Sequence, residues 1–356
     1  MTTLPLPRLQ DLAVGSLGLA LAHVERGDFD AVRHALTHAV AGGVSSGSNA
    51  SLFHGAPALE FVLNCAGADR SDVREAVDRV VVARLATARQ RQKSGALASV
   101  AEFDLIEGLA GLGALLLTRG TPSPILEDVL AYLVSLAQPI HSVGQKLPGW
   151  WTSAGPSGTE LDGGHGNNGI AHGISGPLAV LSLAVRHGVQ VPGHHEAIAL
   201  FASWLDTYGG DYWTTRKQLK ASQPRTLTPS RPSWCYGRAG IARAQQLAAL
   251  ALDDPARRYA AEEALLQTLT DPAWLGRIND ATLCHGWAGL LCVTRTVTND
   301  SPTPDRFATL SADLHQRLIA DIDDLPESGF LEGRLGAQLA AEGTDTTGWT
   351  RLLLIT

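Results

Sequence analysis

The chain has 356 residues, of which 45% are hydrophobic and 18% are charged. This composition builds a large core and excludes a disordered or collagen-like chain. The net charge of -7, from 28 basic and 35 acidic residues, offers no electrostatic basis for binding nucleic acid. The 4 cysteines are too few for a disulfide framework, which indicates a reducing compartment. We therefore expect a globular, cytoplasmic protein that does not bind nucleic acid.

The first apolar segment, residues 12–22, has the hydrophobicity of a signal-peptide core. It lacks a strongly basic lead and a clean cleavage site of small residues, so we interpret it as part of the folded protein. No uncharged apolar run in the sequence reaches the length that spans a bilayer. Any membrane contact is therefore expected to be peripheral and to be made through partners.

A short glycine turn, Gly-x-x-Gly, recurs along the chain, and such internal repeats are the first feature to seek in a long sequence. Successive first glycines are 40 to 65 residues apart, which leaves room for a pair of helices and a connection in each repeat. The first glycines of the turns are Gly15, Gly108, Gly173, Gly237, Gly286 and Gly333, with a degenerate copy at Gly55.

Each turn is followed by a segment rich in alanine and leucine, such as residues 109–117 and 177–185. These segments are apolar on nearly all sides, as helices packed between other helices are. Amphipathic, charged segments lie between them, for example residues 71–84 and 255–267, and we interpret these as outer helices. Strand-like runs are nearly absent. The sequence predicts an all-α fold in which seven inner and seven outer helices close into a ring.

In such a ring the glycine turns begin the inner helices, where the missing side chains let backbones approach closely. Residues that precede the turns then gather at one end of the ring, and we expect the functional site there. Two long connections, residues 138–169 and 208–232, are interpreted as rims or lids over that end, because long loops in compact domains are often functional.

The residues before the turns differ between repeats, and three of them are metal-ligand types. Cys235 precedes the fifth turn, and Cys284 and His285 precede the sixth. Zinc prefers thiolate and imidazole ligands, and three protein ligands with one open position is its catalytic arrangement. Each residue alone is more often a packed core residue. Their joint placement in consecutive repeats favours one Zn²⁺ ion held by all three.

The remaining cysteines, Cys65 and Cys292, lie elsewhere in their repeats and are interpreted as core residues. A zinc ion with two thiolate ligands suits an incoming thiol, because coordination deprotonates the thiol and keeps it nucleophilic. Addition or alkylation at sulfur is therefore favoured, and hydrolysis stays open.

The chain contains three motifs that, in their order, resemble those of the lanthionine synthetase C-like cyclases. They are residues 234–237 (Trp-Cys-Tyr-Gly), 284–286 (Cys-His-Gly) and 171–173 (Ala-His-Gly). The resemblance covers nearly the whole chain and implies an (α/α)7 toroid that carries one Zn²⁺. Such cyclases act on a ribosomal precursor peptide whose serines and threonines have been dehydrated. A peptide cysteine adds to dehydroalanine or dehydrobutyrine and closes a lanthionine or methyllanthionine thioether ring.

The resemblance also implies partners, namely the dehydrated precursor peptide and, within a synthetase complex, a dehydratase and a transporter. Some family members carry an inserted domain between repeats. The spacings here leave no room for one, so we expect one toroid domain over residues 1–356. Recognition of the leader peptide then falls to the toroid, its loops or a partner enzyme.

Carried over residue by residue, the resemblance makes Cys235, Cys284 and His285 the zinc ligands. It makes His172 the acid/base and Asp104 the active-site aspartate, with Arg231 and Tyr236 lining the same site. The addition needs a thiolate, stabilisation of an enolate and a proton at the α-carbon. His172 can donate that proton and Arg231 can stabilise the enolate. Asp104 can orient His172 or accept the thiol proton.

Other functions stay open at this stage. A zinc thiol prenyltransferase also activates a peptide cysteine inside an α/α barrel, but with aspartate among its ligands. A toroidal glycosidase would need paired carboxylates, for which Asp104, Glu107 and Glu332 are available, and would leave the cysteines unused. A lanthionine synthetase C-like protein can also bind or add thiols outside lanthipeptide biosynthesis, without acting as a cyclase.

Overall fold

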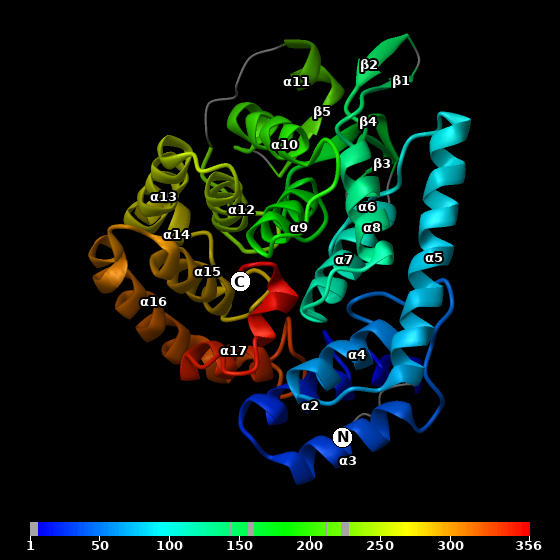
Figure 1. The fold of residues 1–356 in the computed structure, drawn as a ribbon. Helices are drawn as coiled ribbons and strands as arrows, with labels where there is room; N and C mark the ends of the chain where they lie inside the picture. The colour runs from blue at the N-terminus through cyan, green and yellow to red at the C-terminus, as the bar shows by residue number, and fades with distance from the viewer. Residues whose placement is uncertain (1–5, 143, 156–159, 211, 222–227) are drawn as a thin grey trace.

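The computed structural model describes residues 6–142, 144–155, 160–210, 212–221 and 228–356. Within them, the segment after each glycine turn forms an inner helix, and these helices stand side by side in a ring (Figure 1). The last inner helix packs against the first and closes the ring, so the predicted toroid is confirmed. The inner helices are α2 (Ser16–Glu25), α4 (Ala56–Cys65), α7 (Leu109–Thr118), α9 (Ser175–Arg186), α12 (Arg238–Ala251), α15 (Trp287–Asp300) and α17 (Arg334–Glu342).

Outer helices pack on the outside of the ring, and two of them begin where the amphipathic segments predicted, at Ser71 and Pro255. The outer helices are α3 (Phe29–Val40), α5 (Ser71–Ser94), α8 (Pro124–Ser135), α10 (His194–Tyr208), α13 (Pro255–Thr270) and α16 (Ala308–Asp321). Short helices join these elements: α1 (Leu6–Leu9), α6 (Val100–Phe103), α11 (Arg216–Ala221), α14 (Pro272–Leu275), η1 (Pro304–Phe307) and η2 (Ile322–Asp324).

The seventh pair differs from the expectation, because no outer helix follows α17 in the described residues. The chain instead enters the centre of the ring as η3 (Trp349–Leu353) and the residues after it (Figure 1). Leu352 and Leu353 are completely buried, as is Ile355. The run 352–355 consists only of leucine and isoleucine, so it fills the ring rather than covering its outside.

The long connections contain short antiparallel strands that the sequence did not predict. Two of them form a hairpin, and the other three form a sheet in which His165 pairs with both Thr152 and Thr215. The central strand carries a glycine-rich tract, which has low strand propensity, and one of its partners lies in the other connection. The strands are β1 (Ile140–Ser142), β2 (Gln145–Leu147), β3 (Thr152–Ala154), β4 (Glu160–Asn167) and β5 (Trp213–Thr215).

One end of the ring is tied together by backbone hydrogen bonds between neighbouring turns, which we call the belt. In each bond, a residue two or three positions before a turn donates its N–H to a carbonyl of another repeat. Cys235 donates to Cys284, at 3.2 Å, so the two cysteines occupy successive positions in the belt. The bonds of the belt are Leu12 to Phe53, Leu105 to Ala171, Ala171 to Cys235, Cys235 to Cys284, Cys284 to Leu331, and Leu331 to Ala13.

The second glycine of each turn permits the close approach that the belt requires. A Cβ atom on Gly240 would lie 2.0 Å from the carbonyl oxygen of Trp234, and one on Gly289 would lie 2.0 Å from that of Leu283. Neither carbonyl can move away, because both belong to the backbone of the belt segments.

Among the described residues, no helix has both the length and the apolar character needed to cross a bilayer.

Candidate functional site

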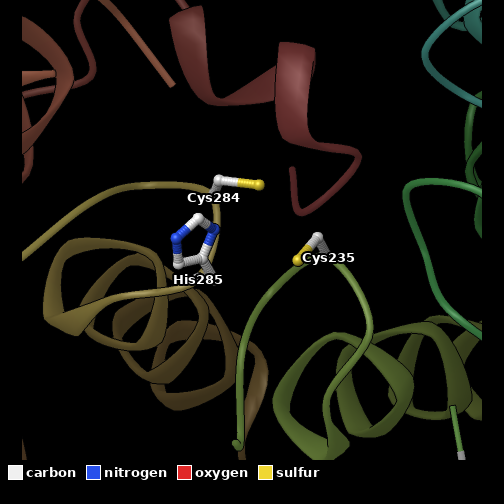
Figure 2. Close-up of side chains that lie close together, drawn as sticks. All are labelled: Cys235, Cys284 and His285. Atoms are coloured by element: carbon white, nitrogen blue, oxygen red, sulfur yellow. The ribbon is translucent and has the colours of Figure 1, made fainter. Parts of the chain in front are cut away.

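The three predicted metal ligands lie on two adjacent turns of the belt. Cys235 stands on the turn before α12, whereas Cys284 and His285 stand on the turn before α15, and their side chains converge (Figure 2). Their ligand atoms all lie within 4.8 Å of one another. Cys235 is buried, with 7% of its surface exposed, and the other two are half-buried. The belt thus preforms the cluster that the repeat pattern predicted.

A zinc ion fits this donor set. Tetrahedral zinc with Zn–S bonds of about 2.3 Å places two sulfurs about 3.8 Å apart, which is compatible with the observed spread of the three atoms. Two thiols and one imidazole are soft-to-borderline donors that select zinc over magnesium or calcium. Three protein ligands leave one position of the tetrahedron for a substrate.

The electrostatics of the cluster favour a thiolate. A hydrogen bond from Cys284 holds the pKa of the Cys235 thiol well below its ordinary value, against the effect of burial, and His285 adds to the lowering. The same hydrogen bond and burial raise the pKa of Cys284. Asp280 and the Cys235 sulfur together raise the pKa of His285 to about 9. Hydrogen bonds from the other two members of the cluster thus favour the thiolate form of Cys235, which is the form that binds a metal.

Asp280 is a residue of this site that the sequence did not reveal. Its Oδ2 atom lies 3.2 Å from Nε2 of His285, and its Oδ1 atom accepts hydrogen bonds from the N–H and the hydroxyl of Thr282 at 2.9 and 2.6 Å. Burial would raise the pKa of Asp280, but the hydrogen bonds from His285 and Thr282 lower it to about 2. The available signal was the Asp-x-Thr turn before Cys284, a spacing typical of side-chain-capped turns.

Asp104 and His172 form a second polar pair, on the turns before α7 and α9. Oδ2 of Asp104 lies 2.7 Å from Nδ1 of His172. Oδ1 of Asp104 accepts the backbone N–H groups of Glu107 and Gly108 at 2.8 and 2.7 Å. Only 1% of Asp104 is exposed, so this carboxylate is fixed. Burial would lower the pKa of His172, but Asp104 raises it above its ordinary value.

Tyr236 connects the aspartate–histidine pair to the cysteines. Its ring stacks on that of His172, with centroids 5.7 Å apart, and lies 5.8 Å from the ring of Tyr212. Burial and the neighbouring negative charges, including that of Cys235, raise the pKa of Tyr236, so its hydroxyl stays neutral. The charge of Cys235 also acts on His172. The two polar groups therefore share one site.

Arg231 lies at the edge of the same site, with a guanidinium nitrogen 3.9 Å from Oδ2 of Asp280. Its side chain is 35% exposed, so it is held loosely. Glu107 and Glu332, the other carboxylates considered, are exposed. Cys65 and Cys292 lie outside the cluster, and burial raises the pKa of each thiol to about 12, as expected of unreactive residues.

Comparisons with known proteins agree with this arrangement. The family model for "Lanthionine synthetase C-like protein" matches residues 7–341. The chain belongs to this family. Among solved structures, a nisin cyclase superposes with a TM-score of 0.81, covering 98% of this chain and 93% of its own, at 19% sequence identity. This superposition shows that the two chains share a fold. No curated protein matches by sequence.

Membership of the lanthionine synthetase C-like family argues against two of the alternatives. A prenyltransferase would place an aspartate among the ligands, but the cluster of the family member described here consists of two cysteines and a histidine. A glycosidase would need a pair of carboxylates free for catalysis. Asp104 is not free, because it is engaged by His172 and by two backbone N–H groups.

Proposed function

We propose that this protein is a zinc-dependent lanthipeptide cyclase, which adds cysteine thiols of a dehydrated precursor peptide to dehydroalanine or dehydrobutyrine. The observation that supports this function best is the convergence of Cys235, Cys284 and His285 within 4.8 Å. The Asp104–His172 pair stands beside this cluster. A thiol-binding metal and a proton-carrying imidazole are the two groups that the addition requires.

The reaction forms one C–S bond at the β-carbon and one C–H bond at the α-carbon, while the C=C π bond and the S–H bond break. Bound by the three ligands, zinc would supply acidity to the substrate thiol, so that it reacts as a thiolate at neutral pH. As the bond forms, negative charge moves to the carbonyl oxygen of the dehydro residue. We assign to Arg231 the stabilisation of this enolate; one well-placed donor at such a position is worth about 3 kcal/mol.

His172 then delivers the proton to the α-carbon. Its Nδ1 is engaged by Asp104, so Nε2 is the nitrogen that exchanges the proton with the substrate. Asp104 orients the ring and, by raising the pKa of His172, favours its protonated form. The Tyr236 ring lies beside the imidazole, with centroids 5.7 Å apart. The proton released by the thiol balances the proton consumed at carbon.

The test uses a synthetic peptide that carries one dehydroalanine and one cysteine. Cyclisation leaves the mass unchanged, so free thiols are counted by maleimide labelling before mass spectrometry. We expect the protein loaded with one equivalent of zinc to consume thiols faster than the spontaneous reaction, and the metal-stripped protein to lose this activity until zinc is restored. A zinc-loaded protein that leaves the spontaneous rate unchanged would contradict the proposal.

The alternative in which the protein binds or adds thiols without cyclising peptides gives a different result in the same assay. Zinc would bind, and a small-molecule thiol would add to a dehydroalanine derivative, while the peptide stayed open. The association with a dehydratase and a transporter, and the location in the cytoplasm, remain predictions. Co-purification of the three proteins from the native cell would test that association.

A further inference from the structure

The loop before Cys284 holds a carboxylate against the imidazole that we assign as a metal ligand. The two sulfurs lie to one side of the His285 ring, and one ring nitrogen faces them while the other is turned away (Figure 2). The nitrogen next to Asp280 is Nε2, at 3.2 Å. Nδ1 is therefore the nitrogen that faces Cys235 and Cys284. This assignment depends on the proposed zinc site but on no step of the reaction.

The position of Asp280 is itself fixed by the local chain. Thr282 donates two hydrogen bonds to Oδ1 of Asp280, and its hydroxyl oxygen accepts the backbone N–H of His285 at 3.2 Å. Gly286 leaves the space that the carboxylate occupies, since a Cβ there would lie 2.3 Å from the same Oδ1 atom. The carboxylate thus has one oxygen committed to the loop and one directed at the imidazole.

We propose that Asp280 is a positioning residue of the metal centre, which accepts a hydrogen bond from the Nε2–H group of His285 and thereby leaves Nδ1 as the nitrogen that binds the metal. A neutral imidazole carries one proton, and whichever nitrogen bears it cannot bind a metal. A carboxylate can only accept, so it selects the tautomer in which Nε2 is protonated. Carboxylate–histidine–metal arrangements of this kind also fix the ring orientation and make the ligand more basic.

The same carboxylate links the metal centre to Arg231, whose guanidinium lies 3.9 Å from Oδ2. Asp280 therefore contacts both a metal ligand and the group proposed to stabilise the enolate. Removal of Asp280 would loosen both, whereas removal of Arg231 would leave the imidazole held. This difference separates the two roles experimentally.

The decisive variant is Asp280→Asn. An asparagine has one oxygen and one NH2 group, so it cannot accept hydrogen bonds from Thr282 and from His285 at once. If the oxygen stays with Thr282, the NH2 group faces Nε2 and favours the tautomer with the proton on Nδ1, which opposes metal binding. We expect zinc affinity, measured by competition with a chromophoric chelator in the absence of peptide, to fall about 10- to 100-fold.

Two further variants complete the design. Asp271→Asn changes another loop aspartate, which accepts the backbone N–H of Ala273 and lies outside the site, and should leave zinc affinity unchanged. Arg231→Gln should also leave zinc affinity unchanged, even where it slows cyclisation. Cobalt substituted for zinc gives a spectroscopic readout, because a weakened imidazole ligand alters the visible d–d bands of Asp280→Asn.

The positioning role would be overturned if Asp280→Asn had the same zinc affinity and the same cobalt spectrum as the unaltered protein. A loss of zinc affinity in Arg231→Gln equal to that in Asp280→Asn would also overturn it, because the effect would then be a general change of charge. If the unaltered protein binds no zinc, both the proposed function and this inference fail. If it binds zinc and Asp280→Asn binds it equally well, only this inference fails. Circular dichroism of each variant confirms that it is folded before the affinities are compared.

Discussion

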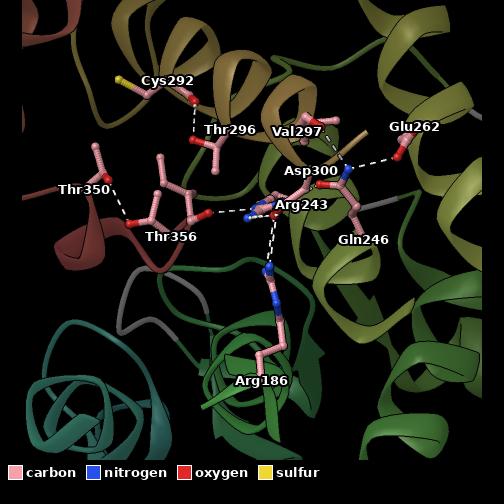
Figure 3. A network of polar contacts seen from close by, with 11 residues as sticks. Arg186, Arg243, Gln246, Glu262, Cys292, Thr296, Val297, Asp300, Thr350 and Thr356 are labelled. Atoms are coloured by element: carbon pink, nitrogen blue, oxygen red, sulfur yellow. Dashed lines mark hydrogen bonds and ion pairs between the residues drawn. The ribbon is translucent and has the colours of Figure 1, made fainter. Parts of the chain in front are cut away.

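The two ends of the ring both carry clusters of polar side chains, but these clusters differ in whether their groups satisfy one another. At the far end, the buried guanidinium of Arg243 donates to the carbonyl of Ile355, to Gln246 and to Asp300, and Arg186 donates to Asp300 as well (Figure 3). Each charge there has an opposite charge or a carbonyl beside it. At the belt end, two thiols and an imidazole face one another, and all three are potential ligands.

The difference teaches how to distinguish a structural cluster from a functional one. A buried network whose donors and acceptors match stabilises one arrangement and needs nothing else. A cluster of two thiols and an imidazole also offers three metal-ligand atoms to one cation, which the network at the far end does not. Changes at the far end should therefore affect stability first, and changes at the belt end should affect zinc binding and chemistry first.

The largest effect is expected from Cys284→Ala. Two ligands cannot hold zinc as three do, so the bound metal should fall from one equivalent to none, and cyclisation should fall by about a thousandfold or more, since metal activation is worth several kcal/mol. Metal analysis and the thiol-labelling assay measure both. Cys65→Ala, which removes a thiol outside the cluster, is the matched control and should retain its zinc. Normal zinc content in Cys284→Ala would break the comparison at its functional end.

Arg243→Met tests the far end. It leaves Asp300 and the Ile355 carbonyl with fewer partners in a buried site, and breaking a buried ion pair from one side costs about 3–5 kcal/mol. The denaturant midpoint should fall accordingly, while zinc content is retained at a temperature where the variant is folded. Arg33→Ala, which removes an exposed ion pair with Asp30, should leave the midpoint unchanged. A loss of zinc without a loss of stability in Arg243→Met would contradict the division between the ends.

His172→Asn sharpens the comparison within the belt end. Loss of the proton donor should lower the rate of cyclisation about 100-fold, since general acid catalysis contributes about 10²–10⁴-fold, and zinc should remain bound. The thiol-labelling assay and metal analysis are run on the same sample. His187→Asn, a change of the same type at an exposed position of the far end, serves as the control. An unchanged rate in His172→Asn would remove the acid role and leave zinc activation standing.

The smallest effect is expected from Asp104→Asn, and it concerns pH. A proton donor works in its protonated form, so on the alkaline side of the profile the rate should fall as the pH rises through the pKa of His172. Asp104 raises that pKa above the ordinary value of 6.5, and burial opposes it. Removing the charge of Asp104 should therefore move the fall to lower pH. A pH–rate profile of kcat measures the shift, and a fall at the same or higher pH would contradict the assigned pairing.

The sequence predicted those features that repeat. Cys235 and Cys284 could be placed together because they stand at the same position of successive repeated turns, with His285 directly after Cys284, and the turns meet in the belt. Asp280 stands six residues before its turn, outside the segment in which ligands were sought, so only the folded chain shows it beside His285. That one domain spans residues 1–356, without an insertion, remains a prediction.

Two parts of the fold were not predictable, for the same physical reason. The strand β4 pairs with β3 in its own connection but also with β5, which lies about fifty residues later, so the three-stranded sheet is completed only in the folded chain. Residues 352–355 are apolar but too short to predict an element, and their place at the ring centre depends on contacts with Trp234 and Arg243. Arg243 likewise reads as an isolated charge in an alanine-rich helix until the ring is assembled.

The last bond of the belt, from Leu331 to Ala13, has a consequence for how the protein is made. It joins segments near opposite ends of the chain, so the ring cannot close until almost the whole protein has left the ribosome. Contacts this distant in sequence form late and slowly, because closing the long loop costs chain entropy before the favourable contacts have formed. Until then the apolar side of α2 that will meet α17 stays exposed. We therefore expect newly made chains to depend on chaperones and to acquire the metal after release, once Cys235 and Cys284 are held in register.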